Sequence, residues 1–477
     1  MTLSDETAFM DAIAQAELVK AGQVTSLELV EAAIARVEKL NPELNAIVTP
    51  MYDVARERAA LPQPDSPLAG VPFVLKDLIA GYAGVPMTCA SRFLADYVPD
   101  HDSELVARHK AAGLITIGKA TASELGILPA SEPDLFGACH NPWDLSLSTG
   151  GSSGGSAAVV AAGIVPMAHG NDAGGSIRIP SSCCGIFGLR PTRARNSFAP
   201  DVGDVMSGLV VEHGLTRSVR DSAALLDATC GPAPGDPYYP PPPERPYLEE
   251  AGREPGRLRV GFTAKSPTPA AVHEDCVKAV ADAAALCEEL GHDVEEITLE
   301  LDVGMVTQAF IGVYVSGAAW MIAAMAKLSG KEPAQDQFEP LTWAMNEMGR
   351  QLPASDYLLG VSALQLMTRA IAGVFSPYDV ILTPTITEPP YPLGTFDEPP
   401  DNPMMSLLRA STVVPFTAIA NFTGLPAMSV PLYWNGAGLP IGTQFTGRYA
   451  DEATLFRLAA QLESARPWAG RKPPVSA

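Results

Sequence analysis

The chain has few cysteines and few basic residues, and each shortage excludes a class of protein. Seven cysteines occur among 477 residues, an odd number with no Cys-x-x-Cys pair. Cysteines this sparse indicate reduced thiols rather than a disulfide framework, as in a cytoplasmic protein. Lysine and arginine number 32 against 54 aspartate and glutamate residues, which gives a formal net charge of −22. Nucleic-acid binding usually needs a basic stripe, so we expect no nucleic acid among the partners.

Motifs that would indicate a cofactor, a metal or secretion are also missing. No phosphate-binding Gly-x-x-x-x-Gly-Lys-Ser/Thr loop and no His-Glu-x-x-His helix is present, and the seven histidines show no ligand spacing. We therefore expect no metal site and no bound phosphate group. The segment from Met1 to Glu6 is acidic and has no apolar stretch, which predicts that there is no signal peptide.

One long segment, from Val303 to Ala326, contains no charged residue. Its length is typical of a membrane-spanning helix. Glycine and polar residues interrupt it, at Gly304, Gln308, Gly312, Ser316 and Gly317. We expect a buried helix or the wall of a cavity here, and no stable membrane insertion.

Helical and strand patterns alternate along most of the chain. A capping box from Thr25 to Glu28 starts a helix that Asn41 and Pro42 should end. The predicted strands are 71–75, 114–117, 165–168, 258–262, 294–297, 378–384, 427–432 and 441–445, the last two as a hairpin. Helices are predicted at 104–112, 156–163, 277–287 and 451–464, and a proline-rich surface connection at 231–246. A strand–helix–strand unit after this connection favours an α/β fold.

Two glycine clusters that contain serine lie close together in the sequence. The first spans 150–156 and the second 171–178, and a small-residue segment, 157–163, joins them. Glycine lets the backbone adopt positive φ and approach another group closely. Serine becomes a covalent nucleophile when a neighbouring group activates it. The two clusters together predict an acyl-transfer site, in which one serine attacks and backbone N–H groups hold the oxyanion.

Three interpretations of these clusters remain open from the residues alone. The first cluster could be a flexible glycine–serine tract, although a buried-looking helix follows it. Its first five residues also match Gly-x-Ser-x-Gly, which would make Ser152 the nucleophile of an α/β-hydrolase, but the preceding 144–149 is a poor buried strand. The third interpretation is a serine–lysine system. Lys76 directly follows an apolar strand, where burial would lower its pKa from about 10 and leave an amine that accepts a proton.

Taken together, seven segments of this chain resemble the amidase signature family. They are 70–77, 150–156, 172–180, 184–192, 378–384, 421–427 and 439–444. The resemblance extends over nearly the whole chain. It implies an α/β fold with one large, mixed, twisted sheet covered by helices on both faces, in a single domain of residues 1–477.

The same resemblance implies roles for individual residues. Ser176 matches the nucleophile that forms the acyl-enzyme, Ser152 the serine on a cis peptide that relays the proton, and Lys76 the general base. The implied oxyanion hole consists of the N–H groups of Ala173, Gly174, Gly175 and Ser176. Asp172 and Arg178 are interpreted as bracing the nucleophile loop rather than reacting.

A substrate pocket is predicted from less specific features. Its expected boundaries are the segments 127–136, 310–325 and 342–348, and its candidate contact residues are Thr121, Tyr314 and Trp320. Many family members have Thr-Asn after the lysine where this chain has Ala120 and Thr121, which weakens the case for Thr121. An apolar pocket with few charges favours an uncharged amide.

The resemblance therefore implies an amidohydrolase that cleaves a non-peptide carboxamide, linear or cyclic, or an aryl acylamide or carbamate. It also implies a reaction that needs neither a metal nor an organic cofactor. Three further segments, 14–19, 168–173 and 459–463, resemble a branch of the family that hydrolyses cyclic amides. The alternative is the amidase subunit of a tRNA-dependent amidotransferase complex, which the acidity and the apolar pocket disfavour. Our remaining expectations are a small-molecule amide as substrate, a homodimer and a cytoplasmic location.

Overall fold

The structure is a computed structural model that describes residues 2–299, 302–397, 399 and 402–477. Its strands are β1 (Ile47–Pro50), β2 (Pro72–Lys76), β3 (Ile115–Ala120), β4 (His140–Asn141), β5 (Asp144–Ser148), β6 (Met167–Asp172), β7 (Phe187–Arg190), β8 (Val211–Thr216), β9 (Arg259–Phe262), β10 (Asp293–Glu296), β11 (Val380–Pro384), β12 (Ala427–Trp434) and β13 (Pro440–Gly447). Its α-helices are α1 (Leu3–Thr7), α2 (Ala12–Lys20), α3 (Ser26–Leu44), α4 (Tyr52–Ala59), α5 (Glu104–Ala111), α6 (Gly154–Ala161), α7 (Arg178–Cys184), α8 (Val219–Thr229), α9 (Tyr247–Ala251), α10 (Glu274–Glu289), α11 (Val303–Ser329), α12 (Pro340–Gln351), α13 (Ala354–Phe375), α14 (Met404–Val413), α15 (Thr417–Thr423) and α16 (Glu452–Ala465).

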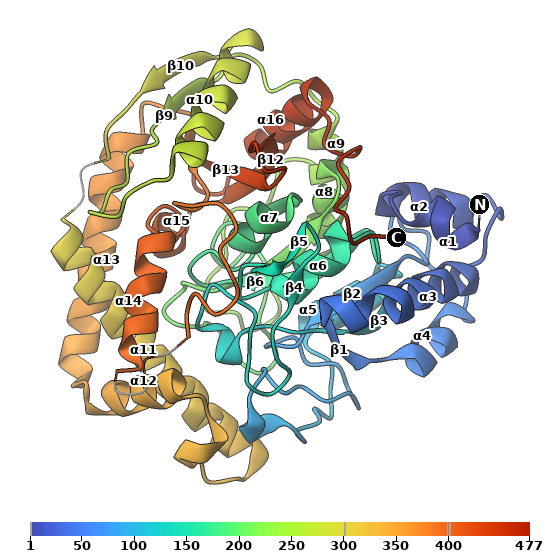
Figure 1. The fold of residues 1–477 in the computed structure, drawn as a ribbon, viewed down its shortest axis with the longest axis horizontal. Coiled ribbons are helices and arrows are strands. Elements are labelled where there is room, and N and C mark those ends of the chain that lie inside the picture. Colours follow the sequence, from blue (N-terminus) through green and yellow to red (C-terminus); the bar gives the residue numbers. More distant parts are fainter. Residues whose placement is uncertain (1, 300–301, 398, 400–401) are drawn as a thin grey trace.

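One large sheet runs through the middle of the molecule, between helices (Figure 1). In the described part of the chain it has eleven strands in the order β1-β3-β2-β6-β8-β7-β12-β13-β11-β9-β10. Strand β2 pairs in parallel with β3 and β6, whereas β6 and β8 pair antiparallel. The sheet is therefore mixed, and the predicted α/β fold is confirmed.

Alternation along β2 explains how the sheet is covered on both faces. Val74 packs in a cluster with α3 and α6, whereas Phe73 and Leu75 pack in a different cluster with α2 and α8. Successive side chains of a strand point to opposite faces, so the two clusters lie on opposite sides of the sheet. Lys76 follows the same alternation and lies on the side of Val74.

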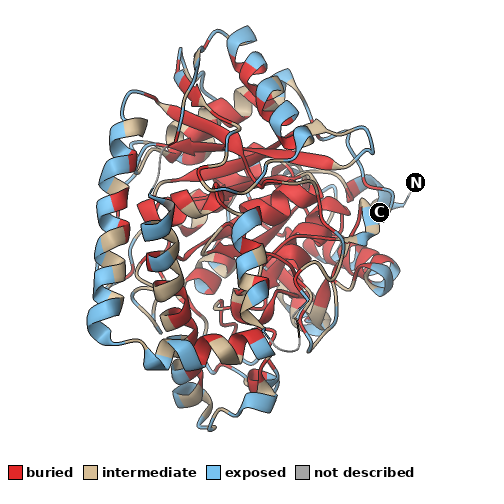
Figure 2. Ribbon diagram, turned by 60° about the vertical axis from the view of Figure 1, so that its left-hand side comes forward, coloured by how far each residue is buried: buried red, intermediate tan, exposed pale blue. Residues whose placement is uncertain are grey.

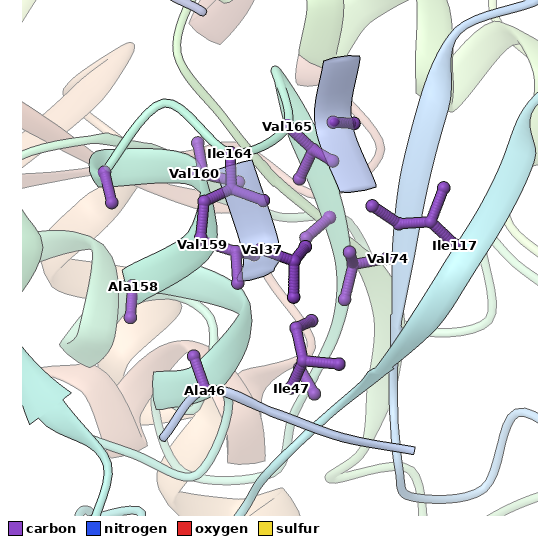
Figure 3. Packing of buried hydrophobic residues seen from close by; sticks show 14 of the residues in the cluster. Val37, Ala46, Ile47, Val74, Ile117, Ala158, Val159, Val160, Ile164 and Val165 are labelled. Atoms are coloured by element: carbon purple, nitrogen blue, oxygen red, sulfur yellow. The ribbon is translucent and has the colours of Figure 1, made fainter. Parts of the chain in front are cut away.

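The cluster on the α6 side is made of small and branched apolar side chains. Figure 3 shows Val37 of α3 between Val159 and Val160 of α6 on one side and Val74 and Ile117 of the sheet on the other. Full burial of each valine or isoleucine stabilises the fold by about 1.5–3 kcal/mol. Figure 2 shows this buried interior in red, with exposed residues on the outer faces of the helices. The helix that follows Ser152 is thus fixed rigidly against the sheet.

Most of the predicted elements are present within a few residues of their expected ends. The Thr25 capping box, the strand that ends at Lys76, the parallel β9–β10 pair around α10 and the β12–β13 hairpin are all confirmed. The predicted end of the first long helix is wrong. Helix α3 continues through Pro42 to Leu44 and stops at Asn45, whose φ of 49° is left-handed. A proline in the last turn removes only one hydrogen bond of the helix, so it does not end the helix by itself.

The long uncharged segment forms α11, which packs beside α12 and α13. Two helices in the described residues, Gly304–Ser329 and Ala354–Phe375, are long and apolar enough to span a membrane by length and composition. The first of these lines the cavities described below, as predicted for a cavity wall. The second carries Leu358, Leu359 and Leu366 on its exposed side.

Candidate active site

Lys76 and the second glycine cluster meet because two strands run side by side in the same direction. Strands β2 and β6 are parallel, with Val74 opposite Ala168. Their carboxyl ends therefore lie at the same edge of the sheet. Lys76 ends β2, and Asn171 and Asp172 end β6. The loop that carries Ser176 leaves the sheet at this edge.

The amine of Lys76 is completely buried and contacts one serine directly. Its Nζ lies 2.6 Å from Ser152 Oγ and 2.6 Å from Asn171 Oδ1. Burial lowers the pKa of Lys76 to about 7, against the opposing effects of the Glu212 and Asp172 carboxylates. At neutral pH a large fraction of this lysine is an uncharged amine. Such an amine has a lone pair and can accept a proton from Ser152.

Ser152 is held in a tight turn at the start of α6. The peptide bond between Gly151 and Ser152 is cis. A Cβ on Gly151 would lie 2.5 Å from the backbone of Ala130, so only glycine fits there. The preceding strand β5 is largely exposed and pairs with β4 in a separate two-stranded sheet. This is not the buried strand that a Gly-x-Ser-x-Gly nucleophile elbow requires.

Ser176 lies in the loop between β6 and α7, where free backbone amides surround it. In the described part of the chain, the N–H groups of Ala173, Gly174 and Ser176 have no acceptor. These three amides can hold an oxyanion beside the Ser176 hydroxyl. The N–H of Gly175 instead donates to Asp172 Oδ1 at 2.9 Å. Gly175 is therefore removed from the predicted set, because an N–H already bonded to a carboxylate is not free for the substrate.

Asp172 fixes the conformation of the loop that carries Ser176. Its two carboxylate oxygens accept from the N–H groups of Gly175 and Ile177 and from both ends of the Arg178 fork. Burial alone would raise the pKa of Asp172, but Arg178 and Arg190 hold it well below its usual range. The interpretation of Asp172 and Arg178 as bracing residues is confirmed by these contacts.

Replacing Asp172 with asparagine should destabilise the protein by about 3–5 kcal/mol at pH 7, because two buried guanidinium groups lose their counter-charge. The pKa of this carboxyl is lowered in the folded state. Its stabilising effect is therefore present above about pH 4 and is lost as the pH falls below that value. Urea or thermal unfolding at several pH values measures both effects. The control is Asp65→Asn, whose ion pair with Lys20 is exposed, and which should change stability by less than about 1 kcal/mol. Equal effects of the two substitutions would contradict the bracing role.

Two cavities meet at Ser176. With the open solvent at their mouths included, the outer cavity has a volume of about 1050 Å³ and the inner cavity about 420 Å³. Besides Ser176, both cavities are lined by Ile127 and Tyr314. Ser152 lines the inner cavity. None of the described residues around either cavity is charged.

The predicted pocket residues are only partly found there. Tyr314 lines both cavities and donates its hydroxyl to the carbonyl of Ile127 at 3.0 Å. Trp320 is 40% exposed and lines neither cavity. On α11 the cavity face recurs every three or four positions and consists of Val306, Thr307, Phe310, Ile311, Tyr314, Ala318 and Met321. Trp320 falls outside that spacing, so its prediction as a pocket wall is wrong.

Thr121 also lies outside both cavities. It is buried, and its hydroxyl has no hydrogen-bond partner among the described atoms. Its backbone packs closely against Gly155, at the start of α6. The structure therefore assigns Thr121 to the packing of α6 rather than to substrate contact.

The predicted boundaries of the pocket need one addition and one change. The segments 127–129 and 310–314 do line the outer cavity, whereas in the predicted segment 342–348 it is Met345, on the inner cavity, that takes part. Another wall of the outer cavity comes from α14, α15 and the turn between them, at Leu407, Leu408, Ala410, Ser411, Val414, Pro415, Ala418, Ile419 and Phe422. Apart from Phe422, which lies in the family-like segment 421–427, no motif marks these residues; their apolar character is the available signal. Across the described residues, no group of three or more His, Cys, Asp or Glu side chains could hold a metal ion.

Comparisons with known proteins agree with this geometry. Residues 28–456 match the protein family described as Amidase. The chain is 37% identical over 480 residues to the 6-aminohexanoate-cyclic-dimer hydrolase of Pseudomonas sp. (strain NK87), covering 98% of this chain and 96% of the relative. It is thus similar to a hydrolase of a cyclic amide, as three segments of the sequence predict.

Solved structures give the same result for the fold. The structure of a 6-aminohexanoate cyclic dimer hydrolase complexed with its substrate superposes with a TM-score of 0.94 at 36% identity, covering 98% of this chain and 100% of that one. A bacterial aryl acylamidase of the amidase signature family superposes with a TM-score of 0.88 at 26% identity, covering 98% and 99% of the two chains. Both similarities extend over the whole sheet and the helices around it.

Proposed function

The chain belongs to the amidase signature family and is a hydrolase of carbon–nitrogen bonds other than peptide bonds, and from this premise we propose that Ser176, Ser152 and Lys76 carry out the reaction. The observation that supports this assignment is the contact of a buried, partly neutral lysine with a serine that shares a cavity with Ser176. A lysine in that state supplies the base that a serine nucleophile needs.

The proposed reaction begins with two coupled proton transfers. Neutral Lys76 takes the proton of Ser152 while Ser152 takes the proton of Ser176. Ser176 Oγ then forms a bond to the amide carbonyl carbon, and the carbonyl oxygen becomes an oxyanion held by the N–H groups of Ala173, Gly174 and Ser176. Each such donor contributes roughly 2.7–4 kcal/mol of transition-state stabilisation.

The second half of the reaction releases the two products. Ser152 donates its proton to the amide nitrogen, the C–N bond breaks and the amine leaves, while Lys76 returns its proton to Ser152. A water molecule then attacks the Ser176 ester, giving up a proton to Ser152 and Lys76. The acid departs, and the proton returns to Ser176. Every proton taken up by the lysine is thus returned within one turnover.

We further propose that the substrate is an uncharged amide whose acyl part is apolar and occupies the outer cavity. Ser152 faces the inner cavity, so the leaving amine that it protonates belongs on that side. The acyl part then extends from Ser176 into the outer cavity, whose described wall is uncharged. An unpaired charge placed there would lose its hydration without a compensating partner. Short linear amides, cyclic amides and anilides all satisfy this requirement.

A matched pair of substrates tests this proposal. Hexanamide and 6-aminohexanamide have nearly the same shape and differ by one terminal cation. We expect kcat/KM for hexanamide to be larger by about 30-fold or more, the equivalent of about 2 kcal/mol. Thr307→Asp adds a carboxylate to the outer cavity and should raise the rate with the cationic amide. Ser362→Asp adds the same charge on the exposed side of α13 and serves as the control.

Three outcomes would contradict the proposed substrate class. Equal rates for the two amides would place the acyl part outside the outer cavity. A gain with Ser362→Asp as large as that with Thr307→Asp would show that the charge acts through the solvent. Glutamine as a far better substrate than any apolar amide would favour the amidotransferase subunit over an independent hydrolase.

We further propose that the protein is a single domain of residues 1–477, and that it acts in the cytoplasm as a homodimer. Continuous pairing supports the single domain, because β7, before the proline-rich connection at 231–246, pairs with β12 after it. The seven cysteines are free and six of them are buried, which supports a reducing location. Sedimentation of the purified protein measures its oligomeric state directly.

A further inference from the structure

A closed circuit of hydrogen bonds begins and ends at Lys76. The Lys76 amine lies 2.6 Å from Asn171 Oδ1, and Asn171 Nδ2 donates to Glu212 Oε1 at 3.4 Å. The other oxygen, Glu212 Oε2, lies 2.7 Å from His169 Nε2. His169 Nδ1 accepts a hydrogen bond from the backbone N–H of Lys76 at 3.3 Å. The circuit thus holds both the backbone and the amine of the same lysine.

The direction of each bond in this circuit is fixed by chemistry. A backbone N–H can only donate, so the Nδ1 atom of His169 that accepts from it carries no proton. The proton of the neutral ring is therefore on Nε2, which donates to Glu212. Asn171 presents its NH₂ group to the same carboxylate, because its oxygen faces the Lys76 amine. Two donors converge on Glu212, and only a carboxylate can accept from both without rearrangement.

The circuit is buried and is carried by three neighbouring strands. Lys76, His169, Glu212 and Asn171 are each at most 3% exposed. Asn171 and Glu212 are directly opposite each other in the antiparallel pair of β6 and β8. Strand β2, which carries Lys76, pairs with β6 on its other side. Sheet pairing thus fixes the positions of all four residues.

We propose that Glu212 is a positioning residue for the reaction, and that its carboxylate holds Asn171 and His169 so that the Lys76 amine presents its lone pair to Ser152. This proposal rests on the assignment of Lys76 as the general base. Asn171 Oδ1 accepts one N–H of the neutral amine, and the lone pair then points toward the Ser152 hydroxyl. Asn171 Nδ2 also donates to the carbonyl of Leu78 at 3.2 Å. Loss of the carboxylate therefore removes one of the two acceptors that hold the Asn171 amide, and the orientation of the Lys76 amine becomes less fixed.

The charge of Glu212 also acts on Lys76. The acidic groups that act on this amine are Glu212, Asp172 and Cys89. Asp172 is paired with Arg178, and burial raises the pKa of the Cys89 thiol to about 12, so Cys89 is uncharged at neutral pH. Within the described residues, the ion-pair contact of Glu212 is with His169. His169 is neutral in this tautomer, so it does not offset the charge of Glu212. Glu212 is therefore the carboxylate that favours the protonated form of Lys76 most.

The other titratable groups around this site leave that conclusion unchanged. They are Lys119 on β3, which lies 3.7 Å from Asp77, His109 on α5 and His213 on β8. Burial lowers the pKa of His213 to about 3 and lowers that of His109 well below its usual value, so both rings are neutral at pH 7. Helix α6 has no charged residue, and the core face of α3 that packs here is apolar.

The test is the pH dependence of kcat/KM for the full chain and its Glu212→Gln variant, with hexanamide as substrate. In the wild type, activity should fall below about pH 7 as Lys76 becomes protonated. Glu212→Gln removes a negative charge, so the midpoint of this fall should move about one pH unit lower. The plateau at high pH should also drop at least about 10-fold, because the base is held less firmly in the orientation that the reaction needs. Glu452→Gln is the matched control, since Glu452 is equally buried and ion-paired but contacts Arg195 instead.

Two results would overturn the proposal. The first is a Glu212→Gln variant with the wild-type midpoint, or with a midpoint moved upward. The second is a Glu212→Asp variant with full wild-type activity, because a side chain one methylene shorter cannot reach both Asn171 and His169. If Glu212→Gln does not fold, the activity of the Glu212→Asp variant tests the proposal on its own. A wild type with no loss of activity around pH 7 would instead contradict the role of Lys76, and with it the proposed function.

Discussion

Ser176→Ala should reduce kcat/KM by about 10⁶-fold, the effect of removing a serine nucleophile from a hydrolase. The substitution removes one hydroxyl at a position that is 7% exposed. That hydroxyl makes no hydrogen bond with the described residues, so the fold should be unaffected. Hydrolysis of an apolar amide by the purified protein measures the loss, and the thermal midpoint shows that the variant is folded.

A covalent serine reagent such as phenylmethanesulfonyl fluoride separates the two serines of the site. We expect the reagent to modify Ser176 in the wild type and to form no adduct with Ser176→Ala. Ser181→Ala is the matched control, because Ser181 is a buried serine on the neighbouring helix whose hydroxyl bonds to the carbonyl of Ile177. It should retain the adduct. An adduct that maps to Ser152 by peptide mass spectrometry would instead support the Gly-x-Ser-x-Gly interpretation.

The position of Lys76 could be predicted from local sequence, because the apolar residues before it indicate a buried strand. The structure confirms that strand and the complete burial of the lysine. The serine clusters could be predicted for a similar reason, since glycine at 151 meets a local steric requirement. These features depend on residues within a few positions of each other, and short-range patterns report them well.

The partners of Lys76 could not be predicted in this way. Glu212 is far from Lys76 in the sequence, and it reaches the site only because β8 pairs with β6. Nothing in the sequence around Glu212 specifies which strand will lie beside it. The role of Gly175 was mistaken for a related reason. A glycine cluster predicts exposed amides, but which of them Asp172 occupies depends on the turn that the loop adopts.

The walls of the outer cavity likewise could be predicted only in part from the sequence. Tyr314 was identified because α11 is unusually apolar, but the helix rotation that turns Trp320 outward is set by packing against α12 and α13. The wall from α14 and α15 carries no recognisable pattern before residue 421. Long-range packing, rather than local preference, therefore determines the part of the site that selects the substrate.

Lys76→Met should give a protein that is inactive at neutral pH and yet more stable than the wild type. Methionine has nearly the shape of lysine but no amine, so it cannot take the proton of Ser152. We expect kcat/KM at pH 7 to fall by about 10²–10⁴-fold, the usual contribution of a general base. The activity that remains should no longer show the fall below about pH 7 that protonation of Lys76 produces in the wild type. Lys76→Arg should be equally inactive, because arginine stays protonated.

The gain in stability follows from the pKa of Lys76, which burial lowers from 10.5 to about 7 in the folded protein. Between these two values the unfolded chain binds more protons than the folded one, so wild-type stability rises with pH across this window. At pH 7 the buried amine therefore costs roughly 2–5 kcal/mol. Methionine removes this cost but leaves Asn171 Oδ1 without its donor, which costs about 1–3 kcal/mol.

The net stabilisation of Lys76→Met should be largest at or below pH 7 and should shrink as the pH rises toward 10. Thermal midpoints of the two proteins, compared at pH 7 and pH 9.5, measure this change. Lys119, the other deeply buried lysine, is present in both proteins, and its contribution cancels in the difference. A stability difference that does not vary with pH would show that Lys76 is not held neutral by burial. If Lys76→Met is inactive and its stability difference does not vary with pH, the reaction requires Lys76 as a charged group and not as the base.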